Sequence, residues 1–540
     1  MPRLGVLGFA TLLIGAAFAL PVVSVLASFF AGASDTWQHL AATALPRYVG
    51  NTLALLLLVS AGVISMGVVA AWLVSSYRFP GRDLLEWALM LPLAMPAYVM
   101  AYVYTDWLQY TGAVQSALRS VTGWQAREYW FPEIRSLWGA AAMLSLALYP
   151  YVYLIARTAF HELSRSAVEA GRLAGLNAWG AFFRVALPLA RPAIVAGSAL
   201  ALMETLADFG TVSYFALEVF TTGIFKAWLS LGDSVAAAQL SGCLLAFVVL
   251  VLALERANRG RAAYATPGRK RAHPHPLRGV KALVAFIACA APVVFGFALP
   301  ALLLAQLAWG ERSAYLGPRM LALIANSFSI AGLTALVAVL LALVMAYAGR
   351  LTRSRIVLGV NRAAGFGYAL PGAVIAVGVL VPLGRLDNAL AAWLEQLLDR
   401  PVGLLLTGTV AALIYAYLVR LLAVSLQTLE AGLARITRSM EDAARSLGAG
   451  PAAALVRVHV PLLAPSLATA ALLVFLDVLK ELPATFALRP FNFDTLAIEA
   501  YNLAKDERLA EAAAPALVIV AVGLLPVLYV TRRYFQATRS

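Results

Sequence analysis

Four carboxylates lie in otherwise apolar stretches of the sequence, as two pairs with the same spacing. Glu204 and Asp208 occur in "ALMETLADFG", and Asp477 and Glu481 occur in "FLDVLKELPA". Within each pair the residues are four apart, so both side chains share one face of a helix. Such carboxylates can line or gate a path for cations, because hard metal ions prefer oxygen ligands. They can equally be structural, with Lys480 neutralising a neighbour or the acids capping broken helix ends.

The sequence around these acids is that of a membrane protein. Of 540 residues, 62% are hydrophobic and only 13% are charged, and the mean hydropathy is +0.82. A soluble protein with this much apolar surface would need more charged residues to cover it. We therefore expect that a lipid bilayer is the solvent of this chain. A carboxylate in the bilayer costs about 2.5 kcal/mol or more unless it faces protein or water. The acids should therefore face the interior of a helix bundle.

Twelve apolar stretches are long enough to be spans, since a bilayer needs about 20 apolar residues per helix. The first has no convincing small-residue cleavage site, so we expect a retained helix rather than a signal peptide. We predict an all-α polytopic membrane protein with spans near 5–30, 51–76, 84–106, 137–158, 191–217, 234–254, 281–307, 326–348, 359–384, 403–426, 463–487 and 512–530.

A basic segment, "ERANRGRAAYATPGRKRAHPHPLRGVK", separates the sixth span from the seventh. Because Lys and Arg collect in cytoplasmic loops, we place this linker, the other Arg-bearing loops and both termini in the cytoplasm. The net charge of +14 has the same explanation, and no nucleic-acid partner is expected. The predicted organisation is a first repeat over 1–255, a linker over 256–280 and a second repeat over 281–540.

The two halves share residues at one spacing. An Asn, an Arg and a Pro recur 275 positions apart, as Asn51 and Asn326, Arg78 and Arg353, and Pro96 and Pro371. A general resemblance between apolar segments does not explain three such matches. Each half has six spans, so the copies have the same orientation and form a parallel repeat, which usually encloses a path between its halves.

A polar segment on the side of the linker is also repeated, in both cases just before the span that carries the acids. The matching positions are 273 residues apart: Glu169 and Asp442, Gly175 and Gly448, Arg184 and Arg457, Pro188 and Pro461. We call each copy a coupling elbow, residues 164–192 in the first half and 437–465 in the second.

Local physical chemistry predicts a helix–turn–helix in each elbow. The glycine should end the first helix, because only glycine turns left-handed at low cost after a helix. Asn177 and Gly450 can cap the second helix, and Pro451 suits its first position. We expect the closing proline, Pro188 or Pro461, to end this second helix before the next span.

The elbows have two interpretations. An amphipathic connector at the membrane surface is one, but the first helix carries few large apolar residues to hold it there. Docking into a groove of a partner protein suits small residues better, and it explains why both halves keep the spacing. We therefore favour docking.

An acid, small residues, Gly six positions later and Pro thirteen after that resemble the EAA loops of ABC importer permeases. The copies here read "EAG" and "DAA". The resemblance covers the whole chain and implies a type I importer permease fold in a bacterial inner membrane. It also implies that two cytoplasmic ATPase subunits, which use the ATP and Mg²⁺, dock on the coupling residues Glu169, Ala170, Gly171, Gly175, Arg184, Pro188, Asp442, Ala443, Ala444, Gly448, Arg457 and Pro461.

The segments "ETLADFGTVSYF" and "DVLKELPATFALRPFNFDTLA" resemble those of the iron(III) importer subgroup. This resemblance implies a periplasmic substrate-binding protein that delivers ferric ion. The four carboxylates are chemically compatible with transient contact to this hard cation, and no resident metal is expected. Thiamine, polyamines and aminoethylphosphonate remain alternative substrates. An ion-coupled secondary transporter also uses parallel six-span repeats, but it has no ATPase to dock on an elbow.

No motif for catalysis occurs in the chain. There is no G-x-x-x-x-G-K-[ST] phosphate loop, no H-E-x-x-H and no nucleophile elbow. Five histidines and two cysteines, Cys243 and Cys289 in apolar stretches, suggest no metal cage and no disulfide framework. We expect a permease subunit that binds no cofactor and takes its energy from a partner.

Overall fold

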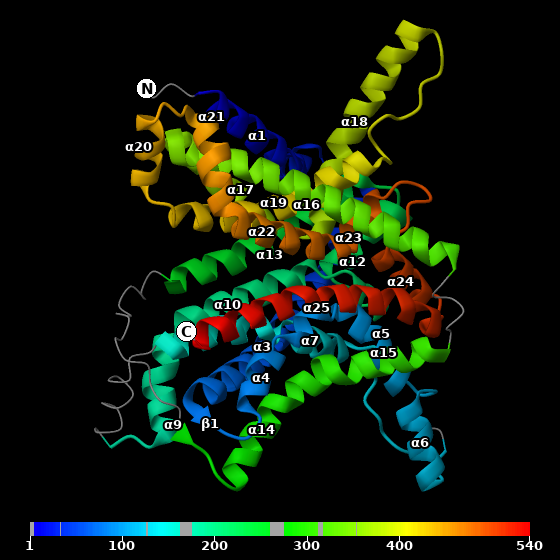
Figure 1. Ribbon diagram of the computed structural model, residues 1–540. Helices are drawn as coiled ribbons and strands as arrows, with labels where there is room; N and C mark the ends of the chain where they lie inside the picture. Colours follow the sequence, from blue (N-terminus) through cyan, green and yellow to red (C-terminus); the bar gives the residue numbers. More distant parts are fainter. Residues whose placement is uncertain are drawn as a thin grey trace. The chain divides into compact units, whose positions relative to one another are not determined.

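The computed structural model describes residues 5–32, 34–125, 128–162, 175–259, 275–310, 317–352 and 354–539. The described chain is almost entirely helical, which confirms the predicted fold class (Figure 1). Eleven of its helices are long and apolar enough to cross a membrane, and one bent pair brings the total to twelve. The single sheet in this part of the chain has two strands of two residues, β1 (Tyr77–Arg78) and β2 (His275–Pro276), which pair in parallel.

The helices form two compact units, which we describe separately. The α16 unit comprises Met1–His39, Ile224–Cys243 and Leu316–Glu499. Its helices are α1 (Val6–Ala27), α16 (Pro318–Thr352), α17 (Arg355–Ala364), α18 (Gly372–Leu398), α19 (Val410–Ala434), α20 (Arg438–Ser446), α21 (Pro451–Ala454), α22 (Val460–Leu479) and α23 (Pro483–Leu488).

The α3 unit comprises Leu40–Gly223, Leu244–Tyr315 and Ala500–Ser540. Its helices are α3 (Leu45–Ser76), α4 (Arg82–Ala88), α5 (Ala97–Leu108), α6 (Ala113–Thr122), α7 (Leu137–Glu162), α9 (Ala178–Ala181), α10 (Leu187–Ala207), α11 (Gly210–Tyr214), α14 (Val280–Val293), α15 (Leu299–Gly310) and α25 (Leu509–Arg539). Four helices pass from one unit to the other: α2 (Asp35–Thr43), α12 (Phe220–Phe225), α13 (Ser234–Arg259) and α24 (Leu496–Lys505).

The compact units do not coincide with the halves of the sequence. Helix α1 precedes the first half's other spans, yet it packs against α16, α17 and α18 of the second half (Figure 1). Conversely, α14 packs against α3, and α15 packs against α25 and α5 within the α3 unit. The first helix of each half thus belongs to the unit of the other half. The predicted repeats describe the sequence, and their boundaries stay a prediction.

The centre of the α16 unit is a tight contact of α16, α19 and α22 (Figure 1). Small residues on α16, such as Ala342 and Ala346, allow the helices to approach closely, as is usual between membrane helices. They pack with larger side chains that are also buried: Met345, Leu422, Leu426, Leu429, Leu433 and Leu463. This core supports the second coupling elbow, which follows α19 in the chain.

The third span of each half is broken at a proline, so the prediction of continuous spans over 84–106 and 359–384 was wrong. In the first half the two parts, Arg82–Ala94 and Ala97–Thr122, meet at an angle of 92°. Pro96 and Pro371 cap α5 and α18 with ψ angles of 139° and 140°. The proline ring disfavours helical geometry in the residue before it, so the preceding helix ends there.

Equivalent hydrogen bonds confirm that the repeated asparagines do the same work in both halves. The Asn51 side chain donates to the carbonyl of Glu218 at 2.9 Å, and the Asn326 side chain donates to the carbonyl of Asp494 at 3.1 Å. Each bond ties the start of a long helix to a loop more than 160 residues away in the chain.

We expect Asn51→Leu and Asn326→Leu each to destabilise the protein by about 1 kcal/mol, because a loop carbonyl loses its donor. Thermal unfolding of the purified protein in detergent measures the effect. Asn388→Leu is the control, since Asn388 is exposed on α18. A control that lowers the unfolding temperature as much as the other two variants would show that leucine, not the lost bond, is responsible.

Candidate functional site

The second coupling elbow has the predicted helix–turn–helix geometry. Helix α20 ends at Ser446, and Gly448 two residues later has a φ angle of +82°. The Ala449 N–H bonds to the carbonyl of Ala444 at 3.0 Å, a closing bond typical of a glycine-terminated helix. Gly450 then caps α21, and Pro451 occupies its first turn, as predicted.

The first elbow is described from Gly175 onward. The coupling residues Glu169, Ala170 and Gly171 lie outside the described residues. Gly175 has a φ angle of +85°, so both glycines take the left-handed conformation that the sequence predicts. The side chain of Asn177 accepts a hydrogen bond from the Gly180 N–H at 2.7 Å, which confirms its capping role at α9.

The closing prolines do not end the second helix, and that prediction was wrong. The chain instead passes through a π-helical turn, Phe182–Ala186 in one half and Leu455–His459 in the other, and continues into α10 or α22. The Leu187 N–H bonds to the carbonyl of Phe182, and the Val460 N–H to that of Leu455, five residues back. This wider turn makes room ahead of a proline, which has no N–H and crowds the carbonyl four residues earlier.

Each elbow exposes large apolar side chains. Trp179 and Phe183 are 71% and 56% exposed in the first elbow, and their rings stack at 6.0 Å. In the second elbow Leu447 is 89% exposed and Val456 is 64% exposed. An exposed apolar surface beside charged residues is typical of a protein contact.

Most of the coupling residues of the second elbow are exposed. Asp442, Ala443, Gly448 and Arg457 are exposed, whereas Ala444 is buried against the bundle. Arg184, the counterpart of Arg457, is exposed as well. The second elbow therefore exposes both charged and apolar side chains, and its one buried coupling residue is the small Ala444.

Two of the four acids have the same structural role in the two halves. Asp208 accepts hydrogen bonds from the N–H groups of Thr211 and Val212 at 3.0 and 3.1 Å, at the start of α11. Glu481 accepts from the N–H groups of Ala484 and Thr485, both at 2.9 Å, at the start of α23. These bonds agree with the structural interpretation, in which the acids cap broken helix ends, because each carboxylate satisfies free N–H groups at the start of a helix.

The other two acids occupy the last turns of α10 and α22. Asp477 forms an ion pair with Lys480 at 2.8 Å, as the structural alternative expects. Glu204 is partly buried on α10. In the described parts of the chain no three His, Cys, Asp or Glu side chains come together as a metal site. A role of the four acids in a translocation path stays a prediction.

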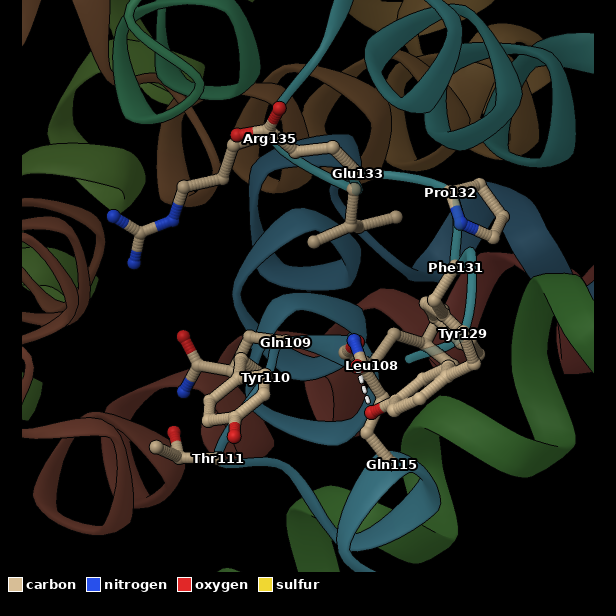
Figure 2. A pocket seen from close by; sticks show the side chains of 11 residues that line it. Leu108, Gln109, Tyr110, Thr111, Gln115, Tyr129, Phe131, Pro132, Glu133 and Arg135 are labelled. Atoms are coloured by element: carbon tan, nitrogen blue, oxygen red, sulfur yellow. Dashed lines mark hydrogen bonds between the residues drawn. The ribbon is translucent and has the colours of Figure 1, made fainter. Parts of the chain in front are cut away.

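Sequence reasoning missed a pocket between α5 and α7, beyond the predicted outer ends of their spans. Figure 2 shows aromatic and polar side chains around it. Its volume is about 620 Å³, and Gln115 at its base donates to the Leu108 carbonyl and accepts from the Tyr129 hydroxyl, both at 2.8 Å. The lining residues are Leu108, Gln109, Tyr110, Thr111, Gln115, Tyr129, Phe131, Pro132, Glu133, Ile134 and Arg135. The only signal in the sequence is a cluster of aromatic residues in an outside loop.

Comparison with known proteins gives consistent similarities. Residues 63–259 match the family described as "Binding-protein-dependent transport system inner membrane component". Over 97% of its length the chain is 27% identical to the Fe(3+)-transport system permease protein FbpB 2 of Haemophilus influenzae, and it covers 97% of that protein. This similarity includes both halves of the chain.

Two further similarities cover a smaller part of the chain. The sulfate transport system permease protein CysT of Escherichia coli is 31% identical over 34% of this chain and 66% of its own length. A putative molybdenum transport system permease protein of Bacillus subtilis, YvgM, is 29% identical over 35% of this chain and 83% of its own length.

We expect Asp208→Ala and Glu481→Ala each to lower stability by about 1 kcal/mol, because α11 and α23 lose their caps. Asp208→Asn and Glu481→Gln keep an acceptor oxygen, so these variants should retain most of the stability. Unfolding temperatures of the four purified variants measure the difference. If the amide variants lose as much as the alanine variants, the negative charge matters in itself and capping is not the whole role.

Proposed function

Because the chain belongs to the family of binding-protein-dependent inner-membrane transport components, we propose that it is the fused permease pair of an ATP-driven ferric iron importer. The observation that supports this proposal best is the pair of coupling elbows on one chain, 273 residues apart, with equal left-handed glycines. A relative named as an iron(III) transport permease is similar over 97% of both chains.

The energy comes from two cytoplasmic ATPase subunits, one on each elbow. Trp179 and Phe183 on one elbow, and Leu447 and Val456 on the other, supply the apolar contacts for docking. The ATPase subunits bind ATP and Mg²⁺, and this chain has no ATP site of its own. When the two ATPase subunits close on each other, they move the elbows. This movement closes the translocation path on one side of the membrane and opens it on the other.

The substrate is delivered from the periplasm by a binding protein. The pocket lined by Tyr110, Tyr129 and Arg135 is the contact we propose for it, because it combines aromatic and charged groups (Figure 2). With the linker and both termini in the cytoplasm, these loops face the periplasm.

Ferric iron is the proposed cargo, since the oxygen atoms of Glu204 and Asp477 suit a hard cation in transit. The relatives whose names refer to sulfate and molybdenum are similar over about a third of this chain, so they support the permease class more than a substrate. Thiamine, a polyamine or aminoethylphosphonate would be carried by the same machinery. The elbows argue against an ion-coupled secondary transporter.

Gly448→Val should abolish ATP-dependent transport while the protein still inserts and folds, because a β-branched residue does not tolerate φ +82° and the turn must rearrange. Uptake into proteoliposomes, with the amount of folded protein checked by gel filtration, measures the effect. Gly450→Ala is the matched control, since Gly450 lies in the same turn at φ −68° with open space around it. Full transport by Gly448→Val would rule out the docking role of this turn.

Proteoliposomes that hold the permease, its ATPase partner and its binding protein should take up ferric ion with ATP, but neither sulfate nor molybdate. Radiolabelled uptake of the three substrates measures selectivity. The permease alone should show no ATP turnover, and hydrolysis by the isolated chain would contradict its assignment as a subunit without an ATP site. Uptake of molybdate or sulfate in place of iron would contradict the assignment of ferric iron as the substrate.

A further inference from the structure

A network of charged groups holds the second elbow to the bundle. Arg350, in the last turn of α16, forms an ion pair with Glu441 of α20. Its guanidinium also donates to the carbonyls of Leu433 and Ile436, the latter at 2.8 Å, at the end of α19. The side chains of Arg350 and Glu441 are only 14% and 12% exposed. One arginine thus joins three helices, α16, α19 and α20.

Two aromatic side chains complete this network. The fully buried His459 lies in the π turn, with its Nε2 atom 3.2 Å from the Glu441 carboxylate. Its ring packs on Tyr347 at 5.3 Å between centroids, and the Tyr347 hydroxyl donates to the carbonyl of Pro451 at 2.9 Å. Residues of α16 therefore contact both helices of the elbow.

The first half has different residues at the equivalent positions. By the repeat spacings of 275 and 273, Arg350 corresponds to Ser75, Glu441 to Val168 and His459 to Ala186. None of these residue types carries a charge, and Val168 lies outside the described residues. At these three positions the first half therefore has no charged pair that corresponds to Arg350 and Glu441.

Aromatic packing occupies the corresponding place in the first half. Trp72, at the position equivalent to Tyr347, packs on Phe160 at 5.2 Å and on Phe182 at 5.1 Å between ring centroids. Phe160 belongs to α7 and Phe182 to the π turn, and both are buried. In its described part, the first elbow is therefore joined to α3 and α7 by aromatic contacts.

We propose that Arg350 is a positioning residue that fixes the docking angle of α20 through Glu441, so that the second elbow depends on a charged pair that the equivalent positions of the first half do not supply. This inference rests on the proposed function, in which each elbow receives an ATPase subunit. Identical ATPase subunits would then push on two elbows that are attached differently to their spans. Loss of the ion pair should loosen one elbow and leave the other unchanged.

The variant Arg350→Met tests the proposal. It should increase hydrogen exchange of the α20 amides by about tenfold or more, because Glu441 is left partly buried without its guanidinium partner. Exchange at residues 175–181 of the first elbow should not change. In the reconstituted transporter, the iron imported per ATP hydrolysed should fall severalfold. Arg355→Met is the matched control, since Arg355 is exposed at the start of α17.

A double variant separates positioning from a general loss of packing. Arg350→Met with Glu441→Met replaces the pair by apolar side chains, which resembles the attachment of the first elbow. Such replacements of whole buried pairs are often tolerated, so α20 protection and coupling should recover relative to Arg350→Met alone. Recovery of neither quantity, or normal exchange in Arg350→Met, would overturn the proposal. If the wild-type chain binds no ATPase subunit, the proposed function fails, while the exchange data still decide whether the ion pair holds α20.

Discussion

The absence of water in a bilayer governs this structure, because every backbone group freed by a helix break must find a partner within the protein. The chain breaks its spans at several places, and at two of these breaks a carboxylate is the local partner. Asp208 and Glu481 accept from the N–H groups at the start of α11 and α23. After each π turn, the residue before the proline bonds through its backbone N–H to the carbonyl five residues earlier. A carboxylate in an apolar segment is therefore explained first by the backbone it satisfies, before any ligand is considered.

The same constraint explains what the two halves share. Asn51 and Asn326 make the same bond to a distant loop carbonyl, and Pro96 and Pro371 begin a helix with the same backbone angles. By contrast, the first helix of each half belongs to the compact unit of the other half. Helix α1, for example, packs on the spans of the second half. Equivalence between the halves thus resides in local backbone chemistry rather than in how helices group into units.

Much of this could be predicted from sequence, since the relevant signals are local. Apolar length gave the spans, and a glycine after a small-residue helix gave the left-handed turns at Gly175 and Gly448. The break at Pro96 and the π turn before Pro188 were missed, because a proline can end, bend or widen a helix according to its tertiary contacts. The exchange of α1 could not be foreseen either, since helices of equal hydropathy do not encode which neighbour they pack against.

The side chains that attach the elbows follow a different rule from the backbone beneath them. A π turn before proline satisfies the same geometric need in both halves, so it recurs whichever residues surround it. The space between this turn and the preceding spans only needs to be filled, and apolar rings or a neutralised charge pair can both fill it. Trp72 with Phe182 does so in one half, and Arg350 with Glu441 in the other. The π turn is thus common to both elbows because it answers a backbone constraint, whereas the side chains packed against it are free to differ between the halves.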